Sequence, residues 1–268
     1  MAAYILIRGG GDLASGVALR LYRAGLQVVV SELAQPLAVR RSVSFAEAVY
    51  EGAWTVEGVT GRLVKGEQVP AALEAGEIPV LVDPDASILS RFDFCAVIDA
   101  RLTKLPPDPL PVPVSLHIGL GPGFRAGENC QAVIETRRSH TLGRVFWEGA
   151  TQPDSGQPEG DPRRVLRAPV AGIVVAHAHI GEHVDEGRLV ASIRGQSGVQ
   201  ESPVASPFAG VLRGLIRPGL RVTAGLKIGD VDPRDDPSMC QLVSDKALAI
   251  GGGVLEALLA RGVVSCRA

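Results

Sequence analysis

The chain has 268 residues, enough to bury a full hydrophobic core as one large or two modest domains. Its 27 lysine and arginine residues nearly balance 29 aspartate and glutamate residues, and a net charge of −2 lacks the basic footprint of a nucleic-acid-binding protein. The longest apolar stretch, 247–260, contains Glu256 and is too short to span a bilayer, and no signal-peptide pattern precedes the first strand, so we expect a cytoplasmic protein without a membrane partner.

The first part of the chain alternates short apolar runs with helical patterns. Strands are predicted at 4–8, 27–31, 79–82, 95–99 and 114–118. Helices are predicted at 13–24, 44–50, 69–75 and 86–91. The strand runs are continuously apolar, which is typical of parallel strands covered on both faces. We therefore expect a Rossmann-like, doubly wound parallel α/β sheet over residues 1–148.

A glycine turn joins the first strand to the first helix. Gly9, Gly11 and Ala14 fit the G-x-G-x-x-A form of a nucleotide-binding turn. Together with Gly10, Asp12 and Leu13, they form the first candidate binding site, for a phosphate-bearing small molecule. The alternative is a turn that is purely structural.

Two carboxylates bear on that interpretation. Glu32 lies 21 residues after Gly11, close to the roughly 20 expected of an acid that holds a ribose hydroxyl. Asp12, in contrast, stands at the helix N-terminus, where its negative charge competes with a pyrophosphate.

A second glycine cluster follows the strand predicted at 114–118. Gly119, Gly121 and Gly123 are expected at the carboxyl end of that strand, where open α/β sheets bind ligands. We predict that they line the same site, or else form an elaborate turn. Arg40 and Arg41 are candidate phosphate contacts. Asp99 and Arg101 end another strand, and we do not require an ion pair between them.

The second part of the chain begins after a polar, proline- and glycine-rich linker at 149–163. Two similar halves then follow at an interval of about 38 residues, each with a proline-led turn, a strand and a G-x-x-V-x-x-G turn. They resemble a lipoyl- or biotinyl-like barrel-sandwich hybrid over 164–235, although the hairpin at 194–201 lacks the lysine that a carrier needs. A helix is predicted at 244–262, packing on the first domain, with a break or a close backbone approach at Gly251, Gly252 and Gly253.

No catalytic constellation is visible in the sequence. No nucleophile stands beside a base, so the catalytic residues are unknown; only His117 and His140 offer themselves as an acid or a base. The cysteines 95, 130, 240 and 266 form no C-x-x-C pair. His177, His179 and His183 cluster without an evident fourth ligand, so no metal site is predicted.

Several segments occur in the same order as in a known family: 9–16 (GGGDLASG), 40–52 (RRSVSFAEAVYEG), 97–101 (VIDAR), 118–124 (IGLGPGF), 133–136 (VIET) and 244–256. On these motifs the chain resembles the selenium-dependent molybdenum hydroxylase system proteins. The resemblance implies an accessory role in maturing such enzymes, with the hydroxylase or its maturation factors as partners. NAD(P) and molybdopterin cytosine dinucleotide are the candidate cofactors. The alternatives are an NAD-dependent oxidoreductase and a non-enzymatic binding or scaffold protein, and the sequence leaves a homo-oligomer open.

Overall fold

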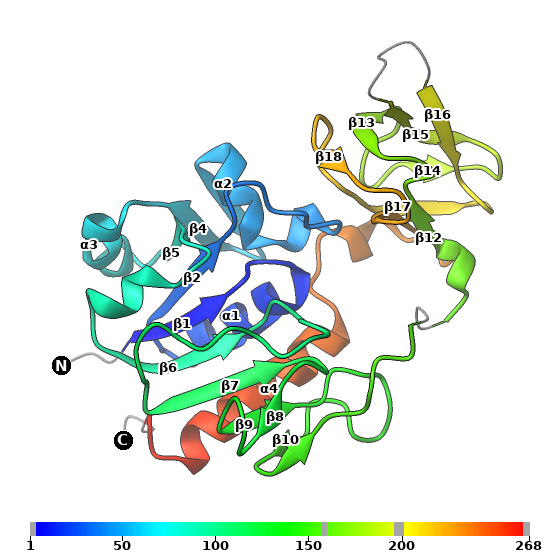
Figure 1. Ribbon diagram of the computed structural model, residues 1–268. Coiled ribbons are helices and arrows are strands. Elements are labelled where there is room, and N and C mark those ends of the chain that lie inside the picture. Colours follow the sequence, from blue (N-terminus) through cyan, green and yellow to red (C-terminus); the bar gives the residue numbers. More distant parts are fainter. Residues whose placement is uncertain (1–3, 157–159, 196–200, 265–268) are drawn as a thin grey trace. The chain divides into compact units, whose positions relative to one another are not determined.

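The computed structural model of the protein describes residues 4–156, 160–195 and 201–264 (Figure 1). These residues form two compact units. Unit 1 comprises residues 1–36, 44–155 and 243–268, and unit 2 comprises residues 37–43 and 156–242. No helix among the described residues has the length and apolar character needed to cross a membrane.

Unit 1 is built on a nine-stranded sheet in the order β10-β9-β7-β6-β1-β2-β5-β4-β3. The strands are β1 Tyr4–Arg8, β2 Val28–Glu32, β3 Ala53–Val56, β4 Val59–Leu63, β5 Ile78–Val82, β6 Phe94–Asp99, β7 Leu116–Leu120, β9 Ala132–Ile134 and β10 Val145–Phe146. The short strands β8 Arg125–Ala126 and β11 Gly149–Ala150 pair separately. Neighbouring strands from β9 to β4 are parallel, whereas β10 and β3 run antiparallel to their neighbours at the two edges.

Two helices of unit 1 are longer than two turns, α1 Asp12–Arg23 and α4 Asp245–Ala260, and they pack against each other. The remaining helical segments of this unit are short: α2 Ala48–Glu51, α3 Val69–Glu74, and single 3-10 turns at Phe45–Glu47, Gly66–Gln68 and Ser87–Ser90. The helix predicted at 44–50 is thus a 3-10 turn followed by α2, and the helix predicted at 86–91 is a 3-10 turn. Helix α4 runs without a break through its three glycines.

The central strands are covered on both faces, which explains their continuous apolar runs. Ile5, Leu6 and Ile7 of β1 are all fully buried. Leu6 shares a face with Val29 and Val97, and on that face the core is completed by α3, the 3-10 turn at 87–90 and the apolar residues of the 110–114 segment.

Unit 2 contains two four-stranded antiparallel sheets. One has the order β12-β19-β17-β14, with β12 Val165–Arg167, β19 Lys227–Asp232, β17 Gly210–Leu215 and β14 His183–Val184. The other has the order β16-β15-β13-β18, with β16 Glu201–Ala205, β15 Leu189–Arg194, β13 Gly172–Ala176 and β18 Arg221–Val222. Single 3-10 turns lie at Arg41–Val43, Pro162–Arg164 and Pro237–Cys240. The turn glycines of the two sequence repeats all have positive φ: Gly181, Gly187, Gly219 and Gly225.

The predicted fold class is wrong. The protein is not a doubly wound, Rossmann-like parallel sheet with a lipoyl-like barrel-sandwich hybrid; it is a mixed α/β fold with one large sheet and several antiparallel sheets. A hairpin causes part of the difference. Strands β3 and β4 join through Glu57 and Gly58, which both have positive φ, and form an antiparallel edge in a stretch where no strand was predicted. At the other edge, β10 folds back on β9.

Candidate functional site

The strand order of unit 1 reverses at β1, because β2 lies on one side of it and β6 and β7 lie on the other. Open α/β sheets bind ligands beyond the carboxyl ends of their strands at such a reversal. In the register of the sheet, Arg8 of β1 pairs with Asp99 of β6, and Asp99 pairs with Gly119 of β7. These three neighbouring residues therefore lie on the same face of the sheet. This edge is the candidate functional site.

The first glycine loop is held from several sides. Gly9 has φ +92°, and its N–H donates to the Ser31 carbonyl at 2.7 Å. The Gly10 carbonyl accepts from the Ala46 N–H at 2.9 Å, and a Cβ at position 10 would lie 2.9 Å from that nitrogen. A Cβ at Gly11, in contrast, would meet nothing within 4 Å. Close packing therefore explains Gly10, while Gly11 faces open space.

Glu32 supports this loop directly. One carboxylate oxygen accepts the N–H of Gly10 at 2.7 Å and the other accepts the N–H of Leu33 at 2.7 Å. Burial raises the pKa of Glu32, and these two hydrogen bonds oppose the rise. Because the carboxylate already holds the Gly10 N–H, that donor is not open to a phosphate. The predicted hydroxyl contact of Glu32 stays a prediction.

The first turn of α1 begins at Asp12 and Leu13, as the sequence indicates, and Gly11 precedes it without a side-chain cap. The carboxylate of Asp12 lies at the positive end of the helix dipole. With Gly10 engaged as well, the loop departs from the arrangement that receives a dinucleotide pyrophosphate.

The second glycine loop is also shaped by packing. A Cβ at Gly119 would overlap the Phe124 ring, and one at Gly123 would overlap the Leu105 carbonyl. Gly121 has φ +110° and lies against Leu102. Both glycine loops contact the segment 100–105, because Gly9 lies against Ala100. They therefore share one edge of the sheet, on either side of that segment.

A buried carboxylate between two arginines forms the centre of this edge. Asp99 is fully buried and accepts from Arg8 at 3.2 Å and from Arg101 at 2.8 and 2.6 Å. The second terminal nitrogen of Arg8 donates to the Pro84 carbonyl at 2.9 Å, while its buried Nε has no partner among the described residues. The Asp99–Arg101 pair, which the sequence analysis did not require, is therefore present.

The two cations differ in accessibility. Burial lowers the pKa of Arg8, whereas the hydrogen bonds to Asp99 raise the pKa of Arg101. The Arg101 side chain keeps 30% of its surface exposed, against 6% for Arg8. Arg101 is thus the charged group that a ligand at this edge would meet.

Arg40 and Arg41 belong to unit 2, whereas this edge is part of unit 1. Arg40 donates to the carbonyls of Met239 and Leu242 at 2.9 and 3.0 Å, and Arg41 donates to the carbonyl of Leu215 at 2.8 Å. These contacts hold the 37–43 segment within unit 2. A phosphate contact by either arginine stays a prediction.

The histidines fall into separate surroundings. His117 of β7 is nine-tenths buried, its ring packs edge-on against Phe124, and its Nε2 has no partner among the described residues. A buried polar atom without a partner costs about 1–3 kcal/mol. His140 is exposed. In unit 2, His177 bonds to Ser192 and His183 to Asp235, and the described residues contain no group of three ligands suited to a metal ion.

The thiols offer no activated nucleophile. Cys95, Cys130 and Cys240 are free, and burial raises the pKa of each, that of Cys130 to about 11. The fourth cysteine, Cys266, lies outside the described residues.

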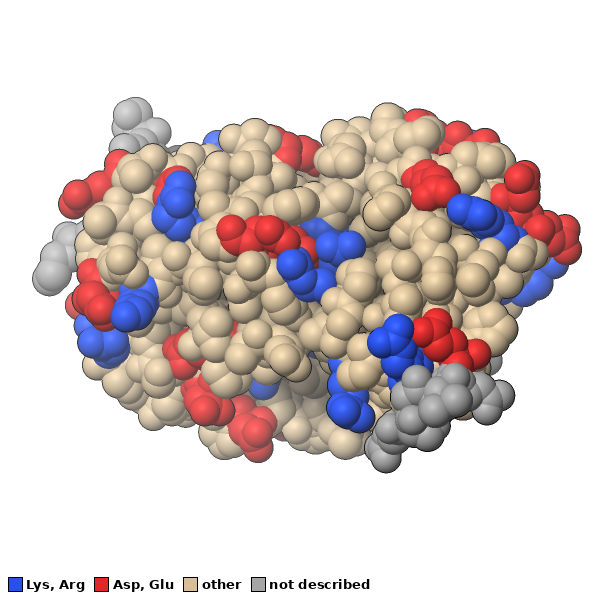
Figure 2. Space-filling model, turned by 90° about the horizontal axis from the view of Figure 1, so that it is seen from above, with Lys and Arg blue, Asp and Glu red and all other residues tan. Residues whose placement is uncertain are grey.

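The face of the protein seen in Figure 2 carries charged side chains of both signs, interspersed among neutral ones.

Comparison with known proteins gives one strong sequence match. The uncharacterized protein YqeB of Escherichia coli (strain K12) is 46% identical over 260 residues, which cover 95% of this chain and 47% of YqeB. The chain therefore spans about half the length of this curated relative. No family model matches the chain.

Among solved structures, similar chains include the ectoine utilization protein EutE (DoeB) from Ruegeria pomeroyi, with 11% identity and a TM-score of 0.27, covering 86% of each chain. An aspartoacylase family protein from Mesorhizobium loti has 13% identity and a TM-score of 0.27. A succinylglutamate desuccinylase/aspartoacylase from Rhodobacter sphaeroides has 11% identity and a TM-score of 0.30. The last two cover 86% of this chain and 85% of their own. At such scores the likeness assigns no activity to this chain.

These findings correct the sequence-based function. The sequence relative is uncharacterized and no family model matches the chain, so nothing supports the resemblance to selenium-dependent molybdenum hydroxylase system proteins. That resemblance is wrong, and so is the maturation role inferred from it. The oxidoreductase and scaffold alternatives fit no better, and the loop geometry at Gly10 and Asp12 argues separately against a dinucleotide.

Proposed function

We propose that unit 1 binds a small molecule carrying one phosphate or carboxylate group together with hydroxyls, at the carboxyl edge of β1 and β6. The observation that carries the proposal is the Arg8–Asp99–Arg101 cluster at the reversal of strand order. One buried carboxylate faces two guanidinium groups, and the exposed part of Arg101 offers forked donors to an anionic group.

The surroundings of the cluster limit the size and charge of the ligand. Asp83 and Asp85 lie close enough to Arg8 for their charges to oppose the lowering of its pKa by burial, and Asp12 begins α1. These carboxylates disfavour a polyanion such as a pyrophosphate. Asp83 already accepts from Ser87 and Ile88, whereas the exposed Asp85 can accept hydrogen bonds from hydroxyl groups. A ligand with one anionic group and hydroxyls therefore suits both Arg101 and Asp85.

A cytoplasmic location is part of this proposal. Cys95, Cys130 and Cys240 are all free thiols. Cysteines that stay free rather than forming disulfides are typical of proteins in a reducing compartment.

The proposal is tested with glycerol 3-phosphate, which combines the two kinds of group, against glycerol and inorganic phosphate, which each carry one. Glycerol 3-phosphate should raise the thermal midpoint of unfolding more than either control. Arg101→Ala should abolish the rise and Arg101→Lys should keep part of it, because lysine retains the charge but not the fork. Asp99 keeps Arg8 as a partner in both variants.

Arg125→Ala is the matched control, because Arg125 is an exposed arginine of the same unit whose partner is Glu128. It should bind like the wild type. An equal response of Arg101→Ala and wild type, or no response of the wild type to glycerol 3-phosphate, contradicts the proposal.

A further inference from the structure

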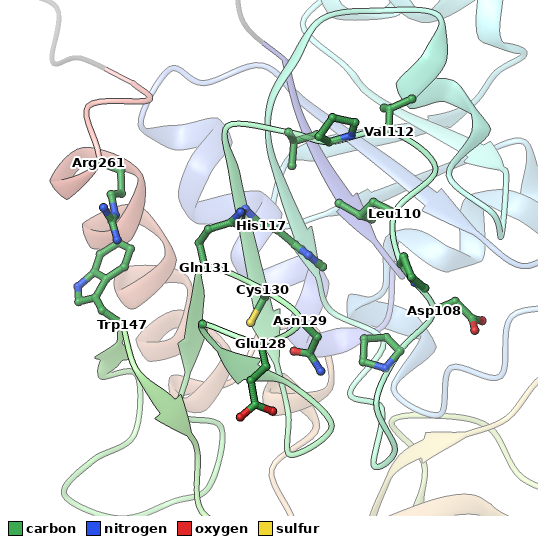
Figure 3. Close-up of a pocket in the computed structure, with 15 residues that line it drawn as sticks. Asp108, Leu110, Val112, His117, Glu128, Asn129, Cys130, Gln131, Trp147 and Arg261 are labelled. Atoms are coloured by element: carbon green, nitrogen blue, oxygen red, sulfur yellow. Dashed lines mark hydrogen bonds between the residues drawn. The ribbon is translucent and has the colours of Figure 1, made fainter.

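Unit 1 has a pocket of about 740 Å³, a volume suited to a small organic molecule. None of the residues of the Arg8–Asp99–Arg101 cluster lines it, although their charges act on His117, which does. Figure 3 shows Leu110 and Val112 of the segment before β7 on one side, and Trp147 and Arg261 on the other. The floor between them is formed by β7 and the turn before β9.

One wall of the pocket is apolar. Three prolines, 107, 109 and 113, line it next to Leu110 and Val112. Across the pocket, the guanidinium of Arg261 stacks on the indole of Trp147, with its Cζ 4.4 Å from the ring centroid. Rigid proline rings and an indole favour a planar ligand.

The charges that line the pocket disfavour an anion. Asp108 and Glu128 are acidic, whereas Arg261 is the one basic residue among the pocket residues and is stacked on Trp147. Burial lowers the pKa of His117, and burial raises the pKa of Cys130 to about 11, so both are neutral near pH 7.

The floor offers an acceptor and a donor. The His117 ring donates a hydrogen bond to the Asn129 backbone, which leaves the buried Nε2 as an acceptor without a partner among the described residues. Gln131 accepts the backbone N–H of His117 through Oε1 at 2.7 Å, which fixes its amide and leaves the amide nitrogen as a donor. The Asn129 side chain, in contrast, is held at both ends by Arg125 and Gly123.

We propose that this pocket binds an uncharged planar nitrogen heterocycle, which presents an N–H to His117 and a neighbouring carbonyl to Gln131. The proline and indole rings favour a planar shape, the acidic Asp108 and Glu128 disfavour anions, and the acceptor–donor pair matches an N–H beside a C=O. This site is separate from the one proposed for an anionic ligand, so either can fail without the other.

Uracil and 1,3-dimethyluracil are the probes, because they share a ring but only uracil has N–H groups. The chain has two tryptophans, so Trp54→Phe leaves Trp147 as the reporter of binding by fluorescence. Uracil should bind at least tenfold more tightly than 1,3-dimethyluracil. Benzoate, which is planar but anionic, should not bind.

His117→Phe tests the acceptor while keeping an aromatic ring against Phe124. It should bring the affinities for uracil and 1,3-dimethyluracil within twofold of each other. Should this variant fail to fold, Gln131→Ala at an exposed position tests the same pocket and should weaken uracil binding at least threefold. Three results overturn the proposal when His117 is intact: equal affinity for uracil and 1,3-dimethyluracil, tighter binding of benzoate than of uracil, or no fluorescence change with uracil.

Discussion

Gly16 of α1 lies directly against Ala247 of α4, so closely that a Cβ at position 16 would overlap the Ala247 methyl group. Gly251 repeats the contact one turn on, where a Cβ would stand 3.2 Å from the Gly16 carbonyl oxygen. Gly253 approaches the Gly143 backbone in the same way. The two helices can touch only because these positions lack side chains, which accounts for glycines inside an unbroken helix.

Adding a methyl group at this contact should destabilise the protein. We expect Gly16→Ala to lower the free energy of unfolding by about 1–3 kcal/mol, because the overlap forces α1 and α4 apart. Gly252→Ala is the matched control, since a Cβ there meets nothing within 4 Å. It should raise the stability by up to about 1 kcal/mol through helix propensity. Urea unfolding followed by circular dichroism measures both, and equal stability of Gly16→Ala and wild type contradicts the packing account.

The glycine loop after β1 permits a similar comparison. Gly10→Ala places a Cβ 2.9 Å from the Ala46 nitrogen, so we expect a loss of about 1–3 kcal/mol in the free energy of unfolding. Gly11→Ala has open space and should stay within about 0.5 kcal/mol of the wild type. A large loss for Gly11→Ala with none for Gly10→Ala would show that the loop is packed otherwise.

His117 should give unit 1 a stability that depends on pH. Burial holds the folded-state pKa below the ordinary 6.5, and Asp99 opposes this while Arg8 and Arg101 add to it. The unfolded chain therefore takes up a proton first, and the free energy of unfolding should fall as the pH drops below about 6.5. His117→Asn should lack this dependence of the free energy of unfolding on pH, whereas His140→Asn, at an exposed position, should keep it. Parallel pH profiles of His117→Asn and wild type between pH 5 and 7 would contradict this expectation.

Asp232 should give unit 2 a pH-dependent stability in acid, because its pKa is also lowered, here by charged partners rather than by burial. The hydrogen bonds from Arg234, assisted by Arg213, lower its pKa from 3.8 to about 2. Its contribution to stability is present above pH 3.8 and is lost as the pH falls toward 2. Asp232→Asn should therefore be less stable than the wild type at pH 6, with the difference shrinking below pH 4. Acid titration of the unfolding midpoint measures this, and a difference that is constant from pH 6 to pH 2 would rule out the ion pairs as its source.

Part of the candidate site can be predicted from the sequence, because the conformation of that part depends on residues that are neighbours along the chain. An apolar run, a glycine turn and a helical pattern predict β1, the loop at Gly9 and α1, and the structure has these elements at Tyr4–Arg8 and Asp12–Arg23. A glycine cluster after β7 is likewise visible as a turn. Local backbone preference and side-chain period are enough for such elements.

The tertiary structure alone decided what these elements mean. Strand pairing places Arg8 level with Asp99, 91 residues away, and no local pattern encodes that contact. It also turned Glu32 toward Gly10, assigned Arg40 and Arg41 to unit 2, and left Nε2 of His117 without a partner among the residues that the structure describes.

The fold class was predicted wrongly because it too depends on contacts between residues far apart in the sequence. The edge strands β3 and β10 are antiparallel because of how hairpins fold back on the sheet, and the sequence pattern of a short apolar run is the same in either direction. Sequence by itself determined where β1, the glycine turn after it and α1 lie, but it predicted no strand at β3, β4, β9 or β10. Their partners and directions, and therefore the charges and pockets they create, depended on contacts between residues far apart in sequence, whose free energy is settled only when the whole core packs.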